Sequence, residues 1–196
     1  PPSEPEVVPE VATWLKAGAP GRDKTPPRFR FAFGACTDPG PGPVNQDNYF
    51  VWEAGDGANA VVIVLDGHGR ELGQMASAVA KRSLRASLCH GAALARLRVE
   101  PRRAMREAFD AAHEAVKAAF REHYERRGWR VREHESGYLV KQRAAPGCGA
   151  GQWSCTQGGT TCTVLAVLDG RSIVVANVGD SDAILGGIAP STATSA

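Results

Sequence analysis

Three aspartates of this chain stand next to predicted strands, at turns rich in glycine or asparagine. Asp66 closes the apolar run Val61–Leu65 and precedes Gly67, Asp47 lies in a polar run before another strand, and Asp180 follows a later strand. Carboxylate oxygens suit hard cations such as Mg²⁺, Mn²⁺ or Ca²⁺ better than Zn²⁺. Two such ions can bind a phosphoryl group and lower the pKa of a water molecule between them. Phosphoryl chemistry is therefore a candidate function.

Asp66 and His68 each allow two interpretations when the local sequence is taken alone. Asp66 is either a metal ligand, with the Gly67 carbonyl turned toward the same ion, or part of a solvated Asp-Gly turn, which is a common turn pair. His68 either donates a proton to a leaving oxygen or is an ordinary turn histidine.

Several other chemistries are disfavoured by the sequence. The cysteines are odd in number and form no CxxC pair, which argues against a disulfide framework or a zinc ribbon and predicts reduced thiols in a cytoplasmic or nuclear protein. They are Cys36, Cys89, Cys148, Cys155 and Cys162. The sequence also has no GxxxxGK phosphate loop, no GxSxG motif and no EF-hand spacing.

Length and charge limit the organisation and the partners. A chain of 196 residues predicts one domain, and a formal net charge of +2 gives no reason to expect nucleic acid or a membrane as partner. No apolar run approaches the roughly 20 residues of a membrane-spanning helix. The oligomeric state is open.

The candidate residues require a β-rich framework. Alternating aromatic residues predict a strand at Phe29–Ala35, and Tyr49–Trp52 and Val61–Leu65 predict a hairpin whose second strand is buried on both faces. Asp169-Gly170 predicts a turn between the strands Thr161–Leu168 and Ser172–Val178. Further elements are expected to be a strand from Ile184 and Leu185 and two helices.

The helices are predicted from residue spacing. Apolar residues recur every three or four positions after Gly69, and a second stripe follows Pro101, which suits a helix's first turn. His113 and His123 are expected to be solvated. Residues 126–157, with a basic patch and a glycine-rich part, are interpreted as a solvated loop insertion.

Four motifs in this order resemble the metal-dependent serine/threonine protein phosphatases of type 2C. The motifs are Asn45-Gln46-Asp47, Val64-Leu65-Asp66-Gly67-His68-Gly69, Gly159-Thr160-Thr161 and Ala176-Asn177-Val178-Gly179-Asp180-Ser181. The resemblance covers about Phe29 to Leu185. It implies an α+β fold of two packed antiparallel β-sheets flanked by helices, an αββα sandwich.

The resemblance also implies two Mg²⁺ or Mn²⁺ ions, and hydrolysis of phosphoserine and phosphothreonine in phosphorylated protein substrates by metal-activated water. Asp66 would bridge both ions and Gly67 would give its carbonyl to one. Asp47 would hold metal-bound water, His68 would be the general acid, and Asp180 would serve an additional, weaker ion.

Departures from the family pattern leave a second function open. The C-terminal part of the family's domain, which supplies two further metal-binding aspartates, has no counterpart after Gly187, and Arg70 and Asp182 stand at altered motif positions. We expect a flexible proline-rich leader (1–28), a partial, weakly active catalytic domain (29–187) and a tail (188–196). The alternative is a pseudophosphatase that acts as a scaffold for phosphoproteins or a kinase.

Overall fold

The computed structural model describes residues 31–143 and 151–186. The expected leader, Cys148 and the expected tail lie outside the described residues. The helices are α1 (Gly73–Leu88), α2 (Gly91–Val99) and α3 (Pro101–Glu125). The strands are β1 (Asn48–Glu53), β2 (Ala60–Leu65), β3 (Gly67–His68), β4 (Trp129–Glu133), β5 (Leu139–Arg143), β6 (Ser154–Cys155), β7 (Gly159–Thr160), β8 (Cys162–Leu168) and β9 (Ser172–Val178).

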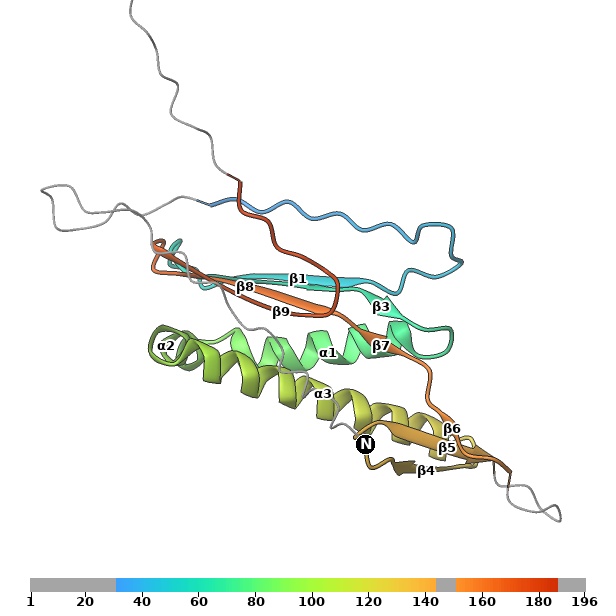
Figure 1. Cartoon of the computed structure of the whole chain (residues 1–196). Helices are drawn as coiled ribbons and strands as arrows, with labels where there is room; N and C mark the ends of the chain where they lie inside the picture. Colours follow the sequence, from blue (N-terminus) through green and yellow to red (C-terminus); the bar gives the residue numbers. More distant parts are fainter. Residues whose placement is uncertain (1–30, 144–150, 187–196) are drawn as a thin grey trace, which may run out of the picture.

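A four-stranded antiparallel sheet in the order β1-β2-β8-β9 forms the centre of the structure. Figure 1 shows α1 and α3 side by side against one face of this sheet, with α2 joining them at one end. Both predicted hairpins, β1–β2 and β8–β9, are confirmed, as are the two long helices. No helix in 31–143 or 151–186 is both long enough and apolar enough to cross a bilayer.

The core lies between the sheet and the helices. Val61, Ile63 and Leu65 of β2 are completely buried there, together with Leu84 of α1 and Met105 of α3. This packing follows from the alternation of a strand combined with the apolar stripes of two helices.

The opposite face of the sheet is more open than the sequence predicted. Val64 of β2 is 46% exposed, so the expectation that this strand is buried on both faces is wrong. Both faces of β2 carry apolar side chains, so its sequence does not indicate that only one face is covered by a second layer.

The α+β class is confirmed by the helical layer and the three antiparallel sheets. Within residues 31–143 and 151–186, however, the other two sheets have only two and three strands. Neither of them forms a second large sheet on the open face. An extended segment beginning at Phe31 crosses above that face (Figure 1).

Two predicted strands are not formed in the described residues. Residues 31–35 pair with no strand, and Phe33 instead lines a hollow together with Val51, Val62 and Val64. The aromatic alternation there reflects packing onto the sheet and not strand pairing. The strand expected from Ile184 is also wrong, because residues 181–186 have no strand hydrogen bonds and Ile184 is 94% exposed.

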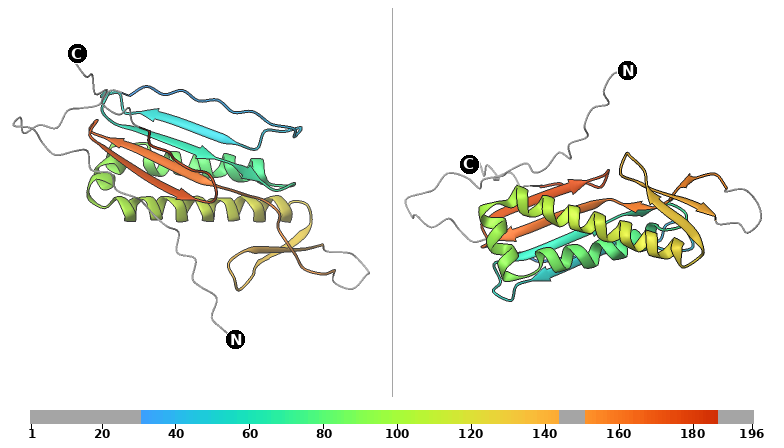
Figure 2. Two further views of the ribbon diagram at one scale, coloured as in Figure 1. Left: turned by 45° about the horizontal axis from the view of Figure 1, so that its top comes forward. Right: turned by 90° about the horizontal axis from the view of Figure 1, so that it is seen from below.

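For the described residues 126–143 and 151–157, the interpretation as a solvated loop is wrong. Strands β4, β5 and β6 form a three-stranded antiparallel sheet, here called the inserted sheet, at the C-terminal end of α3 (Figure 2). Trp129, Val131 and Leu139 pack on Phe120 and Tyr124 of α3. The arginines alternate with these apolar residues and lie on the opposite face of the sheet. The alternation of apolar and polar residues that is typical of a strand is therefore present within the basic patch.

Helix α2 is an element that the sequence analysis did not identify. His90 caps it, because its Nδ1 accepts a hydrogen bond from the Ala93 amide at 3.3 Å, and Leu94 and Leu97 are buried. His113 is exposed as expected, but His123 is half-buried. Burial, followed by the charge of Arg127, lowers the pKa of His123.

An arginine clamp connects α2 to the β8–β9 turn. Arg98 donates from Nε and Nη2 to the two carboxylate oxygens of Asp169, at 2.9 and 2.7 Å, and from Nη2 to Asn59 Oδ1 at 2.9 Å. Asn59 Oδ1 also accepts from the Asp169 amide at 2.9 Å. Asp169 and Gly170 both have positive φ, 58° and 60°, as a two-residue hairpin turn requires.

Replacement of the clamp should change how stability depends on pH. Arg98 is the main cause that lowers the pKa of Asp169, so the ionised pair stabilises the fold above the unfolded carboxyl pKa and loses this effect as the pH falls through the lower folded value. We expect Arg98→Met to cost up to about 1 kcal/mol at pH 7, with a deficit that shrinks below about pH 4. Urea unfolding at several pH values measures this, with the exposed Arg82→Met as control. A deficit that stays constant down to acidic pH would contradict the assignment.

Candidate functional site

The ends of four strands bring the sequence motifs into one row. Asn48 pairs with Leu65, so the next pair beyond the β1–β2 ladder is Asp47 and Asp66. The β3–β7 pairing continues the register of β2–β8, which places Asp66 opposite Thr161. The Thr161 amide donates to the Asp66 carbonyl at 2.9 Å, and the Asp66 amide donates to Thr161 Oγ1 at 3.1 Å.

Asp47 and Asp66 form a pair of like charges at this row. The pKa of Asp47 is raised, first by burial and then by the charge of Asp66, whose carboxyl lies within hydrogen-bonding reach. Thr37 and the Gly67 amide oppose this shift. None of the salt bridges among residues 31–143 and 151–186 includes either carboxylate. Two oxygen-donor groups whose repulsion has no cationic partner fit a hard divalent cation.

Helix α1 fixes the segment that carries Asp47. Ser77 Oγ donates to the Gln46 carbonyl at 2.5 Å and accepts from Asn48 Nδ2 at 2.9 Å. Lys81 Nζ donates to Asn48 Oδ1 at 3.1 Å, and the Asp47 amide donates to Asn45 Oδ1 at 2.9 Å. The Asp47 backbone is therefore held from both sides.

The glycine after Asp66 allows a close approach of three backbone segments. A Cβ atom at Gly67 would lie 2.3 Å from the Gln46 carbonyl oxygen and 2.6 Å from that of Gly73. Only glycine fits this junction. The sequence predicted a glycine with a ligand role here, and the structure gives it a packing role; its carbonyl as a metal ligand stays a prediction.

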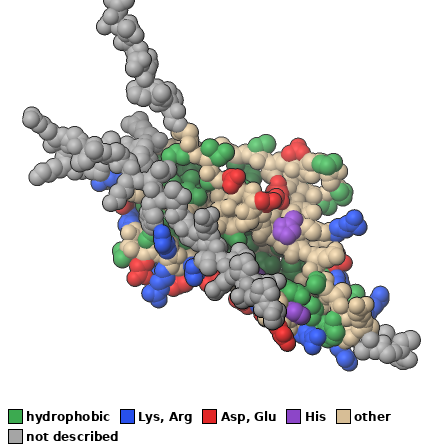
Figure 3. All heavy atoms as spheres, in the orientation of Figure 1, with side chains coloured by type: hydrophobic (Ala, Val, Ile, Leu, Met, Phe, Trp, Pro, Cys, Tyr) green, Lys and Arg blue, Asp and Glu red, His purple; other side chains and the backbone are tan. Residues whose placement is uncertain are grey.

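His68 and Asp180 lie on a second hollow, adjacent to the acidic pair. They line it together with Thr160, Thr161 and Val178, and Figure 3 shows a histidine beside acidic side chains on one face of the molecule. Thr161 Oγ1 forms a 2.7 Å hydrogen bond with Ser181 Oγ, which fixes the turn that carries Asp180.

The structure therefore unites some of the predicted ligands and separates another. Asp38, Asp47 and Asp66 line one hollow, whereas Asp180 lines the other with His68. In the part of the chain that the structure describes, no three His, Cys, Asp or Glu side chains gather into a group that could hold a metal ion. The role of Asp180 as a ligand for an additional ion stays a prediction.

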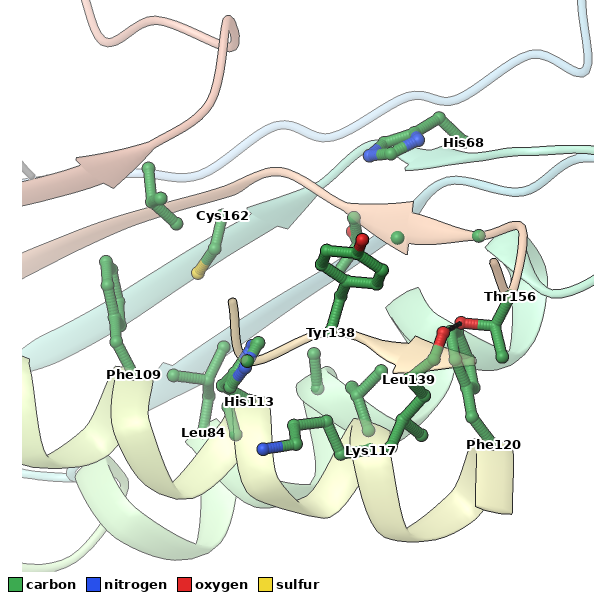
Figure 4. Close-up of a pocket in the computed structure, with 18 residues that line it drawn as sticks. His68, Leu84, Phe109, His113, Lys117, Phe120, Tyr138, Leu139, Thr156 and Cys162 are labelled. Atoms are coloured by element: carbon green, nitrogen blue, oxygen red, sulfur yellow. Dashed lines mark hydrogen bonds between the residues drawn. The ribbon is translucent and has the colours of Figure 1, made fainter. Parts of the chain in front are cut away.

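An apolar pocket of about 300 Å³ lies beside His68. Figure 4 shows Tyr138, from the β4–β5 turn, and Phe109 of α3 reaching toward the space between α3 and β7. His113 and Lys117 stand along its α3 side (Figure 4). The pocket has room for an apolar group next to His68.

Two of the described thiols, Cys89 and Cys162, are unsuited to nucleophilic chemistry. Cys36, Cys89, Cys155 and Cys162 are free, as predicted. Burial raises the pKa of Cys89 to about 11 and that of Cys162 to about 12, which keeps both protonated and poorly nucleophilic.

A comparison with family models matches residues 40–191 to the model described as Protein phosphatase 2C, which is most of the chain. The chain belongs to the protein phosphatase 2C family. A comparison with curated proteins found no significant match, and a comparison with solved structures likewise found none.

The phosphatase 2C match includes Asp47, Asp66, His68 and Asp180 and also spans the inserted sheet. Family membership makes phosphatase chemistry the expected class of activity for the row of strand ends. The resemblance that the four sequence motifs carried is thereby confirmed.

Thr161 and Ser181 lie within the sequence motifs of this phosphatase 2C chain, but the motifs alone assign no role to either residue. In the structure Thr161 connects the two hollows, through Asp66 on one side and Ser181 on the other. The predicted β8–β9 hairpin contained the signal, because its register places Thr161 beside Gly179.

Gly159 should control the position of the His68 ring. A Cβ atom at Gly159 would lie 2.7 Å from His68 Cε1 and Nε2, so Gly159→Ala should displace the ring and shift its NMR resonances. Gly91→Ala is the control, because a Cβ atom there meets nothing within 4 Å. Unchanged His68 resonances in Gly159→Ala would show that the ring does not rest on this glycine.

Proposed function

We propose that this phosphatase 2C chain hydrolyses phosphoserine and phosphothreonine in proteins, with Mg²⁺ or Mn²⁺ bound at Asp47 and Asp66. The observation that carries the proposal is the like-charged pair of carboxylates, held side by side without a cationic partner in the described residues. When bound, such ions supply positive charge for a phosphoryl group and lower the pKa of water. Mg²⁺ commonly uses one or two protein carboxylates and keeps several waters.

The other residues of the row have supporting roles in this proposal. Asp66 and Asp47 hold cations, the Gly67 carbonyl adds an oxygen, and Thr161 fixes the Asp66 backbone. His68 is exposed and next to the pair in sequence, so it can give a proton to the leaving serine or threonine oxygen. Asp180, in the adjacent hollow, is proposed to serve a further ion.

The geometry also leads us to propose slow turnover for the 196-residue chain. The described residues supply few ligands, so water would fill most of the coordination positions of two ions. The positions of the ions relative to the substrate would then be poorly fixed. The resulting enzyme would depend strongly on the metal concentration.

A second candidate is a pseudophosphatase that binds phosphoproteins or a kinase without chemistry. It is favoured because no three His, Cys, Asp or Glu side chains of the described residues gather into a group that could hold a metal ion. The retained pair itself favours the enzyme, because a scaffold does not need two uncompensated charges in contact.

Removal of one carboxylate tests the metal-dependent enzyme. We expect Mn²⁺-dependent hydrolysis of para-nitrophenyl phosphate and a phosphothreonine peptide to fall about 100-fold or more in Asp66→Asn, because metal charge stabilisation is worth several kcal/mol. Mn²⁺ titration calorimetry should show weaker binding in the same variant. Asp110→Asn is the control, because Asp110 is exposed on α3.

Two outcomes decide between the candidates. Peptide binding by the wild-type chain without any metal-dependent hydrolysis would favour the scaffold. Hydrolysis that survives in Asp66→Asn would contradict the proposed site itself.

Arg70 is proposed to hold the phosphate of the substrate. It is exposed in the turn after β3, two residues from His68. We expect Arg70→Ala to raise the inhibition constant of inorganic phosphate about threefold to tenfold, the range for one exposed charge-assisted contact. Arg82→Ala, exposed on α1, is the matched control. Equal phosphate inhibition in both variants would remove Arg70 from the site.

A further inference from the structure

A buried lysine of the inserted sheet binds the loop that follows His68. Lys141 Nζ lies 2.6 Å from Glu71 Oε2 and donates to the Tyr124 hydroxyl at 2.9 Å. The Tyr124 hydroxyl in turn donates to the same Glu71 oxygen. Lys141 is only 7% exposed. These contacts join three parts of the chain: β5, the C-terminal end of α3 and the β3–α1 loop.

The surroundings of Lys141 leave its ammonium group few alternatives. Its Nζ lies 4.1 Å from the Tyr124 ring centroid and 5.1 Å from that of Trp129, both within cation–π range. A buried ammonium group is costly without an anionic partner, and Glu71 is that partner. The ion pair therefore fixes the loop and the lysine relative to each other.

The β3–α1 loop is also tightly packed on both sides of Glu71. Leu72 is buried against Tyr124 and Leu139. A Cβ atom at Gly158, where the chain leaves the inserted sheet, would lie 2.7 Å from Leu72 Cβ, and one at Gly69 would lie 2.7 Å from Gly158 Cα. A shift of Glu71 would consequently be passed to the residues directly before it.

We propose that Lys141 is a positioning residue for the phosphatase reaction. Through Glu71 the inserted sheet holds the β3–α1 loop, and through the loop it holds His68 and Arg70 toward the acidic pair. This inference rests on the proposed function for its consequence in catalysis, while the mechanical connection stands on the contacts alone.

Lys117 provides a matched control on the same interface. Its Nζ lies 3.0 Å from Glu114 and 2.7 Å from Glu133, so it also connects α3 to the inserted sheet. It has no hydrogen bond or salt bridge to residues 69–72. Lys117→Met should weaken the attachment of the inserted sheet without acting on the loop.

Hydrogen exchange of the full chain tests the mechanical connection. In Lys141→Met the amides of residues 68–72 should exchange at least about 10-fold faster, since local opening is then less costly, while Lys117→Met and Lys141→Arg should stay close to wild type. Tyr124→Phe keeps the buried ring and removes only the bridging hydroxyl, so it covers the case in which Lys141→Met fails to fold. Protection of residues 68–72 that is unchanged in both Lys141→Met and Tyr124→Phe would overturn the proposal.

Steady-state kinetics with Mn²⁺ tests the consequence for catalysis. We expect kcat for para-nitrophenyl phosphate to fall about 10-fold in Lys141→Met with KM nearly unchanged, because misplacement of a reacting group acts on the chemical step. Lys141→Arg should restore most of kcat, and Arg82→Met, exposed on α1, should leave it unchanged. A wild-type kcat in Lys141→Met would overturn the catalytic role. If the wild-type chain itself shows no turnover, the proposed function fails, and the hydrogen exchange result still decides whether Lys141 holds the loop.

Discussion

The repulsion between two aspartates is the constraint on which the rest of this structure depends. The carboxylates of Asp47 and Asp66 repel each other, and after burial this repulsion is the next cause that raises the pKa of Asp47. The β1–β2 ladder and the hydrogen bond from Ser77 to the Gln46 carbonyl keep the two residues together. The fold thus holds two negative charges at the end of a rigid sheet, where a cation can relieve the repulsion.

The remaining parts of the site are arranged around this pair by two different kinds of structure. Thr161 and Asp66 each lie between two paired strands, so the strand register sets their positions. The loop with Arg70 and Glu71 has no such ladder, and Glu71 is held by Tyr124 of α3 and by Lys141 on the inserted sheet. A rigid acidic pair is therefore bordered by a loop whose position depends on a separate small sheet.

Much of this arrangement could be predicted from the sequence, and the exceptions have physical causes. The apolar run ending at Leu65 and the Asp169-Gly170 turn carried strong local signals, so the central sheet and its helices were predicted. The inserted sheet was missed because arginines fill its solvent face and hide the alternation. The pairing of Lys141 with Glu71 could not be seen either, since it joins positions 70 residues apart. Motif order also does not reveal that Asp180 lines a different hollow from Asp47 and Asp66.

The arginine clamp at the far end of the sheet has a consequence for the whole strand pair. Side chains alternate along a strand, so a slip of β8 by one residue would exchange the faces occupied by Thr161 and Cys162. Arg98 and Asn59 grip the turn at Asp169 and oppose such a slip. The position of Thr161 therefore depends on a turn at the opposite end of the sheet. An error in forming that turn would displace Thr161.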